Sequence, residues 1–110
     1  MDRYDVRVTD YAVGQMAETT QYISGTLASP EAARRLLADL KSTMAECAYL
    51  PSRYALVQSE PWKSEGIRLI AVKNFHLYYR IDEEMKQVWF IAVIYAGRNQ
   101  DRELLNALLK

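Results

Sequence analysis

Three runs of β-branched and aromatic residues lie between residues 66 and 98, each about as long as a strand and separated by short polar turns. The runs cover residues 66–72, 75–81 and 88–95. Connections this short can join only antiparallel neighbours, so the pattern predicts a three-stranded meander. The third run is apolar throughout, which is typical of a central strand that is buried on both faces.

Alternation along the second run predicts a sheet with two different faces. One face would be apolar and covered by helices, and it would carry Phe75, Leu77, Tyr79 and Ile81. The other face would carry His76, Tyr78 and Arg80. Arg68 of the first run would join that second face if the strand register places it there, and the sequence leaves this register open.

A first strand and a helix are predicted before the meander. Residues 4–9 alternate between apolar and polar side chains, and Thr9 or Asp10 can cap the helix that follows. Apolar and small residues then recur at helical spacing over residues 11–24, and Gly25 ends this helix. The stripe that would pack on the sheet is Val13, Met16, Ala17, Thr20, Ile23 and Leu27.

The second predicted helix has signals at both ends. Ser29 is a good N-cap, Pro30 suits the first helical position, and Glu31 complements the helix dipole. Pro51 stops the helix. Its apolar stripe is Ala33, Leu36, Leu37, Leu40, Met44, Cys47 and Leu50.

Two further segments flank the meander. Residues 52–65 form a polar and aromatic connection, in which Trp62 is either a lid over the edge of the core or a contact surface for a partner. Residues 100–110 form a short amphipathic helix that either packs on the sheet or stays exposed for a partner. The apolar positions of this helix are Leu104, Leu105, Leu108 and Leu109.

The order of elements is therefore β-α-α-β-β-β-α, which predicts an α+β fold with two antiparallel helices packed on a small antiparallel sheet. Residues 1–110 show no repeat, low-complexity stretch or linker, so we expect one domain. Pairing of the first strand with the third run of the meander would explain why that run is apolar on both faces.

Composition excludes several classes of protein. Cys47 is the single cysteine, so an internal disulfide is impossible and a reducing cytoplasm is expected. No apolar run approaches the roughly 18 residues of a membrane span, and residues 1–5 show no secretion signal. One histidine and one cysteine make no spaced metal set, and the sequence shows no cofactor motif such as a glycine-rich phosphate loop.

The candidate chemistry is a set of cations and aromatic groups near the predicted sheet. The set is Arg68, Lys73, His76, Tyr78, Arg80, Tyr95 and Arg98. Its arginines could bind RNA phosphates and stabilise a phosphorane-like transition state, while a histidine or tyrosine transfers protons. Each residue also suits a surface or packing role. The formal net charge of the chain is zero, so affinity for nucleic acid would need local geometry or a partner.

Several of these motifs, taken in order, resemble the RelE/ParE superfamily of bacterial type II toxins over nearly the whole chain. The motifs are Val8-Thr9-Asp10-Tyr11-Ala12, Ser29-Pro30-Glu31-Ala32-Ala33, Gly66-Ile67-Arg68, Tyr78-Tyr79-Arg80-Ile81 and Val93-Ile94-Tyr95-Ala96-Gly97-Arg98-Asn99. The resemblance implies the β-α-α-β-β-β fold and a plasmid stabilisation protein, a toxin that a cognate antitoxin wraps and neutralises. It also implies assembly, either into a homo-oligomer or with the antitoxin, which would lay an amphipathic segment over an apolar surface.

The resemblance leaves two growth-arresting activities open. RelE-like members are ribosome-dependent endoribonucleases (mRNA interferases), whereas ParE-like members poison DNA gyrase. By position, Arg68 and Arg80 match basic sheet residues of the family, and Arg98 matches the arginine after the last strand. Together with His76 and Tyr95, these arginines are the candidate catalytic residues if the chain is a nuclease.

Departures from the family pattern slightly favour the ParE-like activity. The last helix has no Tyr or His where a RelE-like catalytic group would lie, and Leu105 is at or near that position. The zero net charge is also unlike the strongly basic nucleases. In the other direction, Glu60-Pro61-Trp62-Lys63 resembles a Glu-Pro-x-Lys piece of the YoeB branch, where the glutamate is the base. A further alternative is a relative that has lost its toxicity and only binds an antitoxin.

Overall fold

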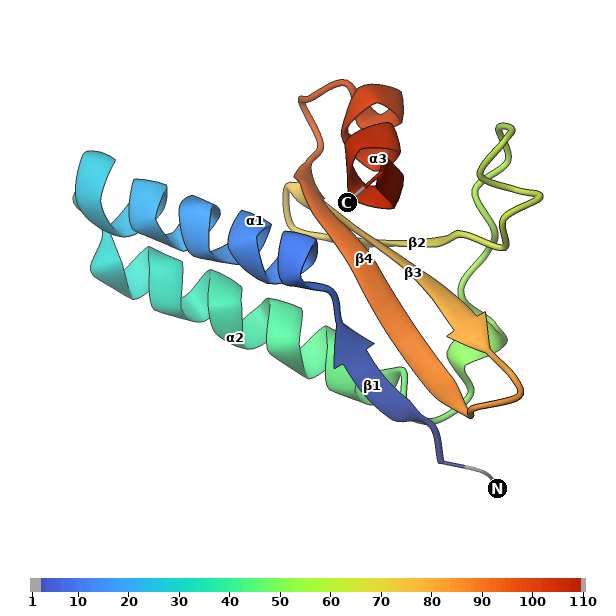
Figure 1. Cartoon of the computed structure of the whole chain (residues 1–110). Helices are drawn as coiled ribbons and strands as arrows, with labels where there is room; N and C mark the ends of the chain where they lie inside the picture. The colour runs from blue at the N-terminus through green and yellow to red at the C-terminus, as the bar shows by residue number, and fades with distance from the viewer. Residues whose placement is uncertain (1–2, 110) are drawn as a thin grey trace.

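The computed structural model describes residues 3–109, so Met1, Asp2 and Lys110 of the predicted domain lie outside the described residues. The elements are β1 (Asp5–Val8), α1 (Asp10–Gln21), the π-helical turn η1 (Tyr22–Thr26), α2 (Pro30–Glu46), the 3-10 turn η2 (Pro51–Arg53), β2 (Arg68–Val72), β3 (Phe75–Asp82), β4 (Gln87–Tyr95) and α3 (Gln100–Leu109). Helices α1 and α2 lie side by side, and α3 lies apart from them beside the sheet (Figure 1). The predicted α+β fold and element order are confirmed.

The strand order in the sheet is β1-β4-β3-β2, so β4 is a central strand. β1 pairs with β4 in parallel, from Asp5 opposite Gln87 to Val8 opposite Phe90, which confirms the predicted partner of the first strand. The sheet is therefore mixed, whereas an antiparallel sheet was predicted. β2, β3 and β4 form the predicted antiparallel meander. Most side chains of β4 are buried, as the apolar run predicted for a strand covered on both faces.

The first helix begins as predicted but ends differently. The Thr9 hydroxyl accepts a hydrogen bond from the Ala12 N–H at 3.1 Å, which makes Thr9 the N-cap. α-Helical geometry stops at Gln21, and the π-helical turn η1 continues through Gly25, which was the predicted end of the helix. The chain turns away from the axis of the helix at Ala28, which has a φ of 51° and donates its N–H to the Gly25 carbonyl.

The side of α1 that faces the sheet is also different from the predicted stripe. Ala12 and Met16 are buried, whereas Val13 and Leu27 are 49% and 54% exposed. The reason lies at the start of the helix, where the Thr9 N–H donates to a carbonyl of β4. This bond fixes which side of the first helical turn meets the sheet.

The second helix begins at Pro30, the predicted first helical position. Ser29, the predicted N-cap, makes no side-chain hydrogen bond to the helix within the described part of the chain. Its main-chain carbonyl instead accepts the first helical hydrogen bond, from the Ala33 N–H at 3.1 Å. The helix ends at Glu46, so Leu50, the last residue of the predicted stripe, lies beyond it and is exposed.

Apolar side chains pack on both faces of the sheet. The face toward α1 and α2 buries Ala12, Met16, Leu36, Leu40, Met44, Cys47, Ile70, Phe75, Leu77, Tyr79, Val88, Phe90 and Val93. The opposite face, called the outer face below, buries Trp62, Ile67, Tyr78, Ile91, Ala92, Ile94 and Leu104. Leu104 belongs to α3 and is 1% exposed. Of the two alternatives for the last helix, packing on the sheet is therefore the one observed.

Trp62 closes the edge of the outer face. It is 4% exposed, and its indole Nε1–H donates to Asp101 Oδ1 of α3 at 2.9 Å. The connection between η2 and β2 is thus held to the start of α3. Of the two interpretations of Trp62, the lid over the core agrees with its burial.

Candidate functional site

Strand register separates Arg68 from the other candidate residues on the sheet. Arg68 is opposite Tyr79 and shares its face of the sheet with Ile70 and Val72, toward α1 and α2. His76, Tyr78 and Arg80 alternate with the buried residues of β3 and lie on the outer face. The register that the sequence left open therefore places Arg68 apart from them, on the face that carries Ile70 and Val72.

Main-chain carbonyl groups bind the Arg68 side chain. Its Nη1 donates to the carbonyl oxygens of Ser52 at 3.2 Å and Tyr54 at 2.6 Å. The Tyr79 hydroxyl donates to the Pro51 carbonyl nearby. Burial raises the pKa of Tyr79 above its ordinary value, so this hydroxyl keeps its proton and remains a donor. Arg68 and Tyr79 together fasten the segment around η2 to the sheet.

His76 belongs to a small hydrogen-bond network beneath the start of α3. The Gln100 Oε1 accepts hydrogen bonds from the Tyr78 hydroxyl at 2.7 Å and from His76 Nδ1 at 3.1 Å. The Gln100 Nε2 donates to the main-chain carbonyls of Tyr95 and Arg98, each at 2.9 Å. One amide therefore joins β3, the end of β4 and α3.

The Tyr78 hydroxyl acts in this network as a neutral donor. Burial raises its pKa to about 12, and the carboxylate of Asp101 adds to the shift. A tyrosine with so high a pKa is a poor general base near neutral pH. The position of His76 beside it accordingly favours a structural part for both residues.

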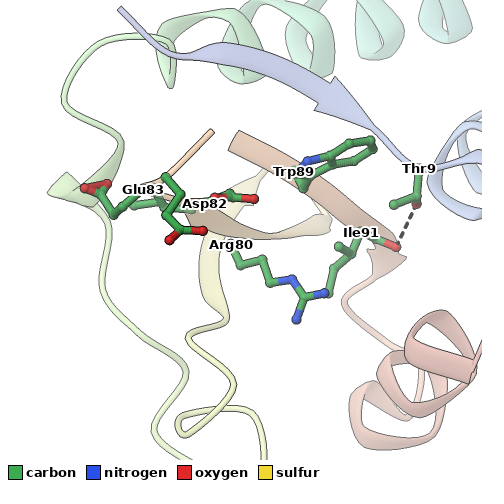
Figure 2. A pocket seen from close by; sticks show the side chains of 8 residues that line it. Thr9, Arg80, Asp82, Glu83, Trp89 and Ile91 are labelled. Carbon is green, nitrogen blue, oxygen red and sulfur yellow. Dashed lines mark hydrogen bonds between the residues drawn. The ribbon is translucent and has the colours of Figure 1, made fainter. Parts of the chain in front are cut away.

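Arg80 lines a hollow of about 620 Å³ beside the β3–β4 turn, called the Trp89 hollow below. Its walls are Thr9, Arg80, Ile81, Asp82, Glu83, Glu84, Trp89 and Ile91. Figure 2 shows Asp82 and Glu83 at one end, Thr9 and Ile91 at the other, and Arg80 and Trp89 between them. The Arg80 Nη1 lies 3.8 Å from Glu65 Oε2, and both side chains are about half exposed.

Tyr95 and Arg98 line a different hollow, of about 870 Å³, called the Tyr95 hollow. It lies between α1, η1, the end of β4 and the start of α3. The Tyr95 ring is 49% exposed and meets Phe75 edge-on, with ring centroids 5.7 Å apart. The Arg98 Nη1 lies 3.4 Å from Glu103 Oε1 on an exposed surface.

Glu60, the base suggested by the resemblance to the YoeB branch, caps a turn. Its Oε1 accepts a hydrogen bond from the Ser64 N–H at 2.9 Å. This interaction with Ser64 lowers the pKa of Glu60, which is fully exposed. A carboxylate with a lowered pKa is a weaker base, so the local structure does not favour that role.

The five candidate residues therefore occupy three places. Arg68 is on the face toward α1 and α2, and His76 and Arg80 are on the outer face with Tyr78 between them. Tyr95 is the last residue of β4, and Arg98 follows it in the turn before α3. Among residues 3–109, no three His, Cys, Asp or Glu side chains gather as metal ligands. No helix in the same range is long and apolar enough to cross a membrane.

Comparison with protein families gives a match over most of the chain. The model of the family described as "ParE toxin of type II toxin-antitoxin system, parDE" covers residues 6–100. The chain belongs to the ParE toxin family. The resemblance to the RelE/ParE superfamily, found in the sequence motifs, is thereby confirmed. No curated protein sequence matches this chain.

Solved structures share the fold of this ParE-family chain at low sequence identity. The chromosomal ParDE toxin–antitoxin system from P. aeruginosa matches with a TM-score of 0.70 and 16% identity, over 86% of this chain and 98% of that chain. The toxin–antitoxin complex RelBE2 from Mycobacterium tuberculosis matches with a TM-score of 0.62 and 23% identity, over 88% of this chain and 97% of that chain. A mutant of the E. coli toxin RelE in the free state matches with a TM-score of 0.60 and 16% identity, over 94% of this chain and 96% of that chain.

Sequence reasoning missed two residues that organise this ParE-family fold. Trp89 was counted among the buried residues of an apolar run, although it is partly exposed and lines the hollow beside Arg80. Gln100 was assigned only to the start of the last helix, although its amide joins three elements. Trp89 and Arg80 are neighbours on one face because the β3–β4 register pairs them. The hydrogen bonds of Gln100 to β3 and β4 depend on where α3 packs on the sheet.

Proposed function

We propose that this chain is a toxin that arrests growth by acting on DNA gyrase, and that a cognate antitoxin neutralises it. Membership of the ParE toxin family supports this activity over mRNA cleavage. The observation that carries the proposal is the position of Arg68, which lies on the opposite face of the sheet from His76 and Arg80. A nuclease site needs its phosphate-binding and proton-transferring groups around one scissile bond.

The hydrogen bonds of Arg68 and His76 support the same conclusion. Arg68 donates from Nη1 to the carbonyls of Ser52 and Tyr54, so this end of its guanidinium is bound inside the fold. His76 is bound to Gln100 beneath α3. Using either side chain on RNA would first require these bonds to break. A formal net charge of zero also provides no overall attraction for the ribosome's RNA.

The antitoxin part of the proposal rests on the structural relatives and on one exposed surface. The P. aeruginosa relative is a ParDE system, and the M. tuberculosis relative is a toxin–antitoxin complex. In this chain, Tyr22, Leu27 and Tyr95 are each about half exposed and line the Tyr95 hollow. Exposed aromatic and aliphatic side chains grouped in this way are typical of protein interaction surfaces.

Inducible expression in bacteria with pulse-labelling of DNA and protein synthesis tests the proposal. We expect DNA synthesis to stop first, with filamentation and an SOS response, while ribosome-bound mRNA stays intact. Early arrest of translation with mRNA cut on ribosomes would instead make the chain a RelE-like nuclease. Growth without any defect, with an antitoxin still bound, would favour the non-toxic binding protein.

A biochemical assay tests the target directly. Purified protein should inhibit supercoiling of relaxed plasmid by purified bacterial DNA gyrase, and co-expression with the antitoxin should remove the inhibition. The Arg98→Ala variant tests whether the exposed Arg98 contacts gyrase, with Arg102→Ala, at an exposed position of α3, as a charge-matched control. Equal inhibition by both variants would remove Arg98 from the contact surface.

A further inference from the structure

We propose that the Trp89 hollow is a docking site for an arginine or lysine side chain on the protein that this toxin acts on. This inference rests on the proposed function, which makes the target a protein. It adds the place of contact and the chemistry of the group that binds there.

The hollow has a buried apolar residue at one end and an oriented aromatic ring in its lining. Trp89 is directly opposite Arg80 in the β3–β4 register, so both side chains are on the outer face. Ile91 lines one end of the hollow beside Thr9, is 4% exposed, and its carbonyl accepts a hydrogen bond from the Thr9 hydroxyl (Figure 2). The Trp89 Nε1–H donates to Gln87 Oε1 at 2.9 Å, which sets the orientation of the ring.

A partly exposed tryptophan held in one orientation is suited to bind a cation. The face of an indole ring attracts ammonium and guanidinium groups, and tryptophan is the strongest of the aromatic residues in this respect. Tryptophan is also enriched among the residues that contribute most to protein–protein binding. Because the ring is already oriented, a partner would lose little conformational freedom in using it.

The charges of the lining select a cation over an anion. The lining contains three carboxylates, those of Asp82, Glu83 and Glu84, and one guanidinium, that of Arg80. Two of them are held in place, because Asp82 Oδ1 accepts from the Met85 N–H at 3.0 Å and Glu83 accepts from the Tyr4 hydroxyl at 2.8 Å.

The same charges make a nucleic acid an unsuitable ligand for this hollow. A phosphate group placed there would meet the three carboxylates, whereas an arginine or lysine would meet them with favourable charge. Arg80 is itself 3.8 Å from the carboxylate of Glu65, so part of its charge is already balanced. A volume of about 620 Å³ is larger than one side chain, which leaves room for the loop that carries it.

Titration of the two tryptophan indole groups by NMR tests the chemistry of the site without gyrase. Residues Trp62 and Trp89 give two Nε1–H signals, and the buried Trp62 is an internal control. We expect N-acetyl-arginine amide to shift the Trp89 signal and to leave Trp62 unchanged, while N-acetyl-glutamate amide shifts neither. No shift at Trp89, or a shift caused by a short single-stranded RNA instead, would overturn the proposal.

Two variants connect the hollow with the target, and a third is their control. Glu84→Lys reverses a charge on the turn, and Trp89→Ala removes the ring. Glu46→Lys makes the same charge change at the exposed end of α2, away from the hollow. Loss of an interface anchor weakens binding by about tenfold or more. We expect losses of that size in gyrase inhibition for the two hollow variants and none for the control.

The two experiments separate the failure of this inference from the failure of the proposed function. If the wild-type protein does not inhibit gyrase, the proposed function is wrong, and the arginine titration alone then decides whether the hollow binds a cation. If the wild-type protein inhibits gyrase and both hollow variants inhibit it equally well, the docking site is wrong while the function stands. Trp89→Ala also removes packing and can lower stability. If this variant is unstable and Glu84→Lys is not, the gyrase inhibition by Glu84→Lys decides whether the docking site is correct.

Discussion

The ring of Tyr95 lies across Gly97, so closely that a Cβ atom added to Gly97 would stand 2.5 Å from the ring carbon Cε2. No side chain larger than hydrogen fits at this position while the ring stays where it is. The turn after β4 is thus built with Tyr95 folded over it. The Arg98 N–H then donates to the Tyr95 carbonyl at 3.0 Å, which completes the turn that leads into α3.

Replacing Gly97 with alanine should move the Tyr95 ring away from the turn. The ring is half exposed and can move outward, but it then loses its contact with Phe75. We expect this loss to lower the free energy of unfolding by about 1 kcal/mol. Urea unfolding measures the change. Gly14→Ala is a matched control, because nothing lies within 4 Å of the added Cβ in α1, and there alanine should stabilise the protein by up to about 1 kcal/mol. A Gly97→Ala variant as stable as wild type would contradict the close packing.

Cys47 should make stability depend on pH in the alkaline range. Burial raises the pKa of this thiol from 9.0 to about 11. A group whose pKa is higher in the folded state stabilises it fully below the unfolded value, and that contribution is lost as pH rises through the folded value. We therefore expect stability to fall between pH 9 and about 11, and less steeply in Cys47→Ala.

Reaction with a thiol reagent gives a second measure of the same residue. In the folded protein at pH 8, Cys47 should react slowly with a disulfide reagent, because the thiolate is the reactive form and the side chain is buried. In urea the reaction should reach its ordinary rate. Fast reaction without denaturant would show that the thiol is accessible in the native state.

The order of elements could be predicted because each strand and helix is marked in its own stretch of sequence. The apolar run of β4 predicted a central strand, and its pairing with β1 followed from the need to cover both faces. The end of α1 could not be predicted in the same way. Gly25 is a strong local signal, but the chain instead turns at Ala28, where the bond to the Gly25 carbonyl closes the coil.

The candidate residues could be named from the sequence, but their grouping could not. Arg68 lies among apolar residues of β2, and a shift of one position in register would move it to the other face of the sheet. The register is set by packing of the whole sheet, and no pattern within β2 alone predicts it. For the same reason the pairing of Arg80 with Trp89 was not visible before the structure.

Replacing Gln100 with leucine should loosen α3 from the sheet. The variant keeps most of the bulk but removes the amide that binds the Tyr78 hydroxyl and the carbonyls of Tyr95 and Arg98. Unsatisfied groups of this kind cost about 1–3 kcal/mol in stability. Hydrogen exchange should show faster exchange of α3 amides. Asn106→Leu, at an exposed position of the same helix, should leave both measurements near wild type.

Arg68 should contribute to stability more than the other two arginines that match the family pattern. Its guanidinium donates to the carbonyls of Ser52 and Tyr54, and hydrogen bonds from a charged group contribute about 1–3 kcal/mol. We therefore expect Arg68→Ala to lower the free energy of unfolding by about 1–2 kcal/mol in urea denaturation. Arg80→Ala and Arg98→Ala should change it by less than about 0.5 kcal/mol, since both arginine side chains are largely exposed to solvent.

The same three variants separate a structural role of Arg68 from a role in toxicity. If Arg68 acts only by holding η2 to the sheet, its alanine variant should lose growth arrest in proportion to the loss of folded protein, and growth at lower temperature should restore both. Arg68→Lys should recover part of the stability, because an ammonium group keeps the charge and can donate to a carbonyl, but it lacks the planar guanidinium that orients the donors of arginine. An Arg68→Ala protein with wild-type stability and no toxicity would instead place Arg68 in contact with the target.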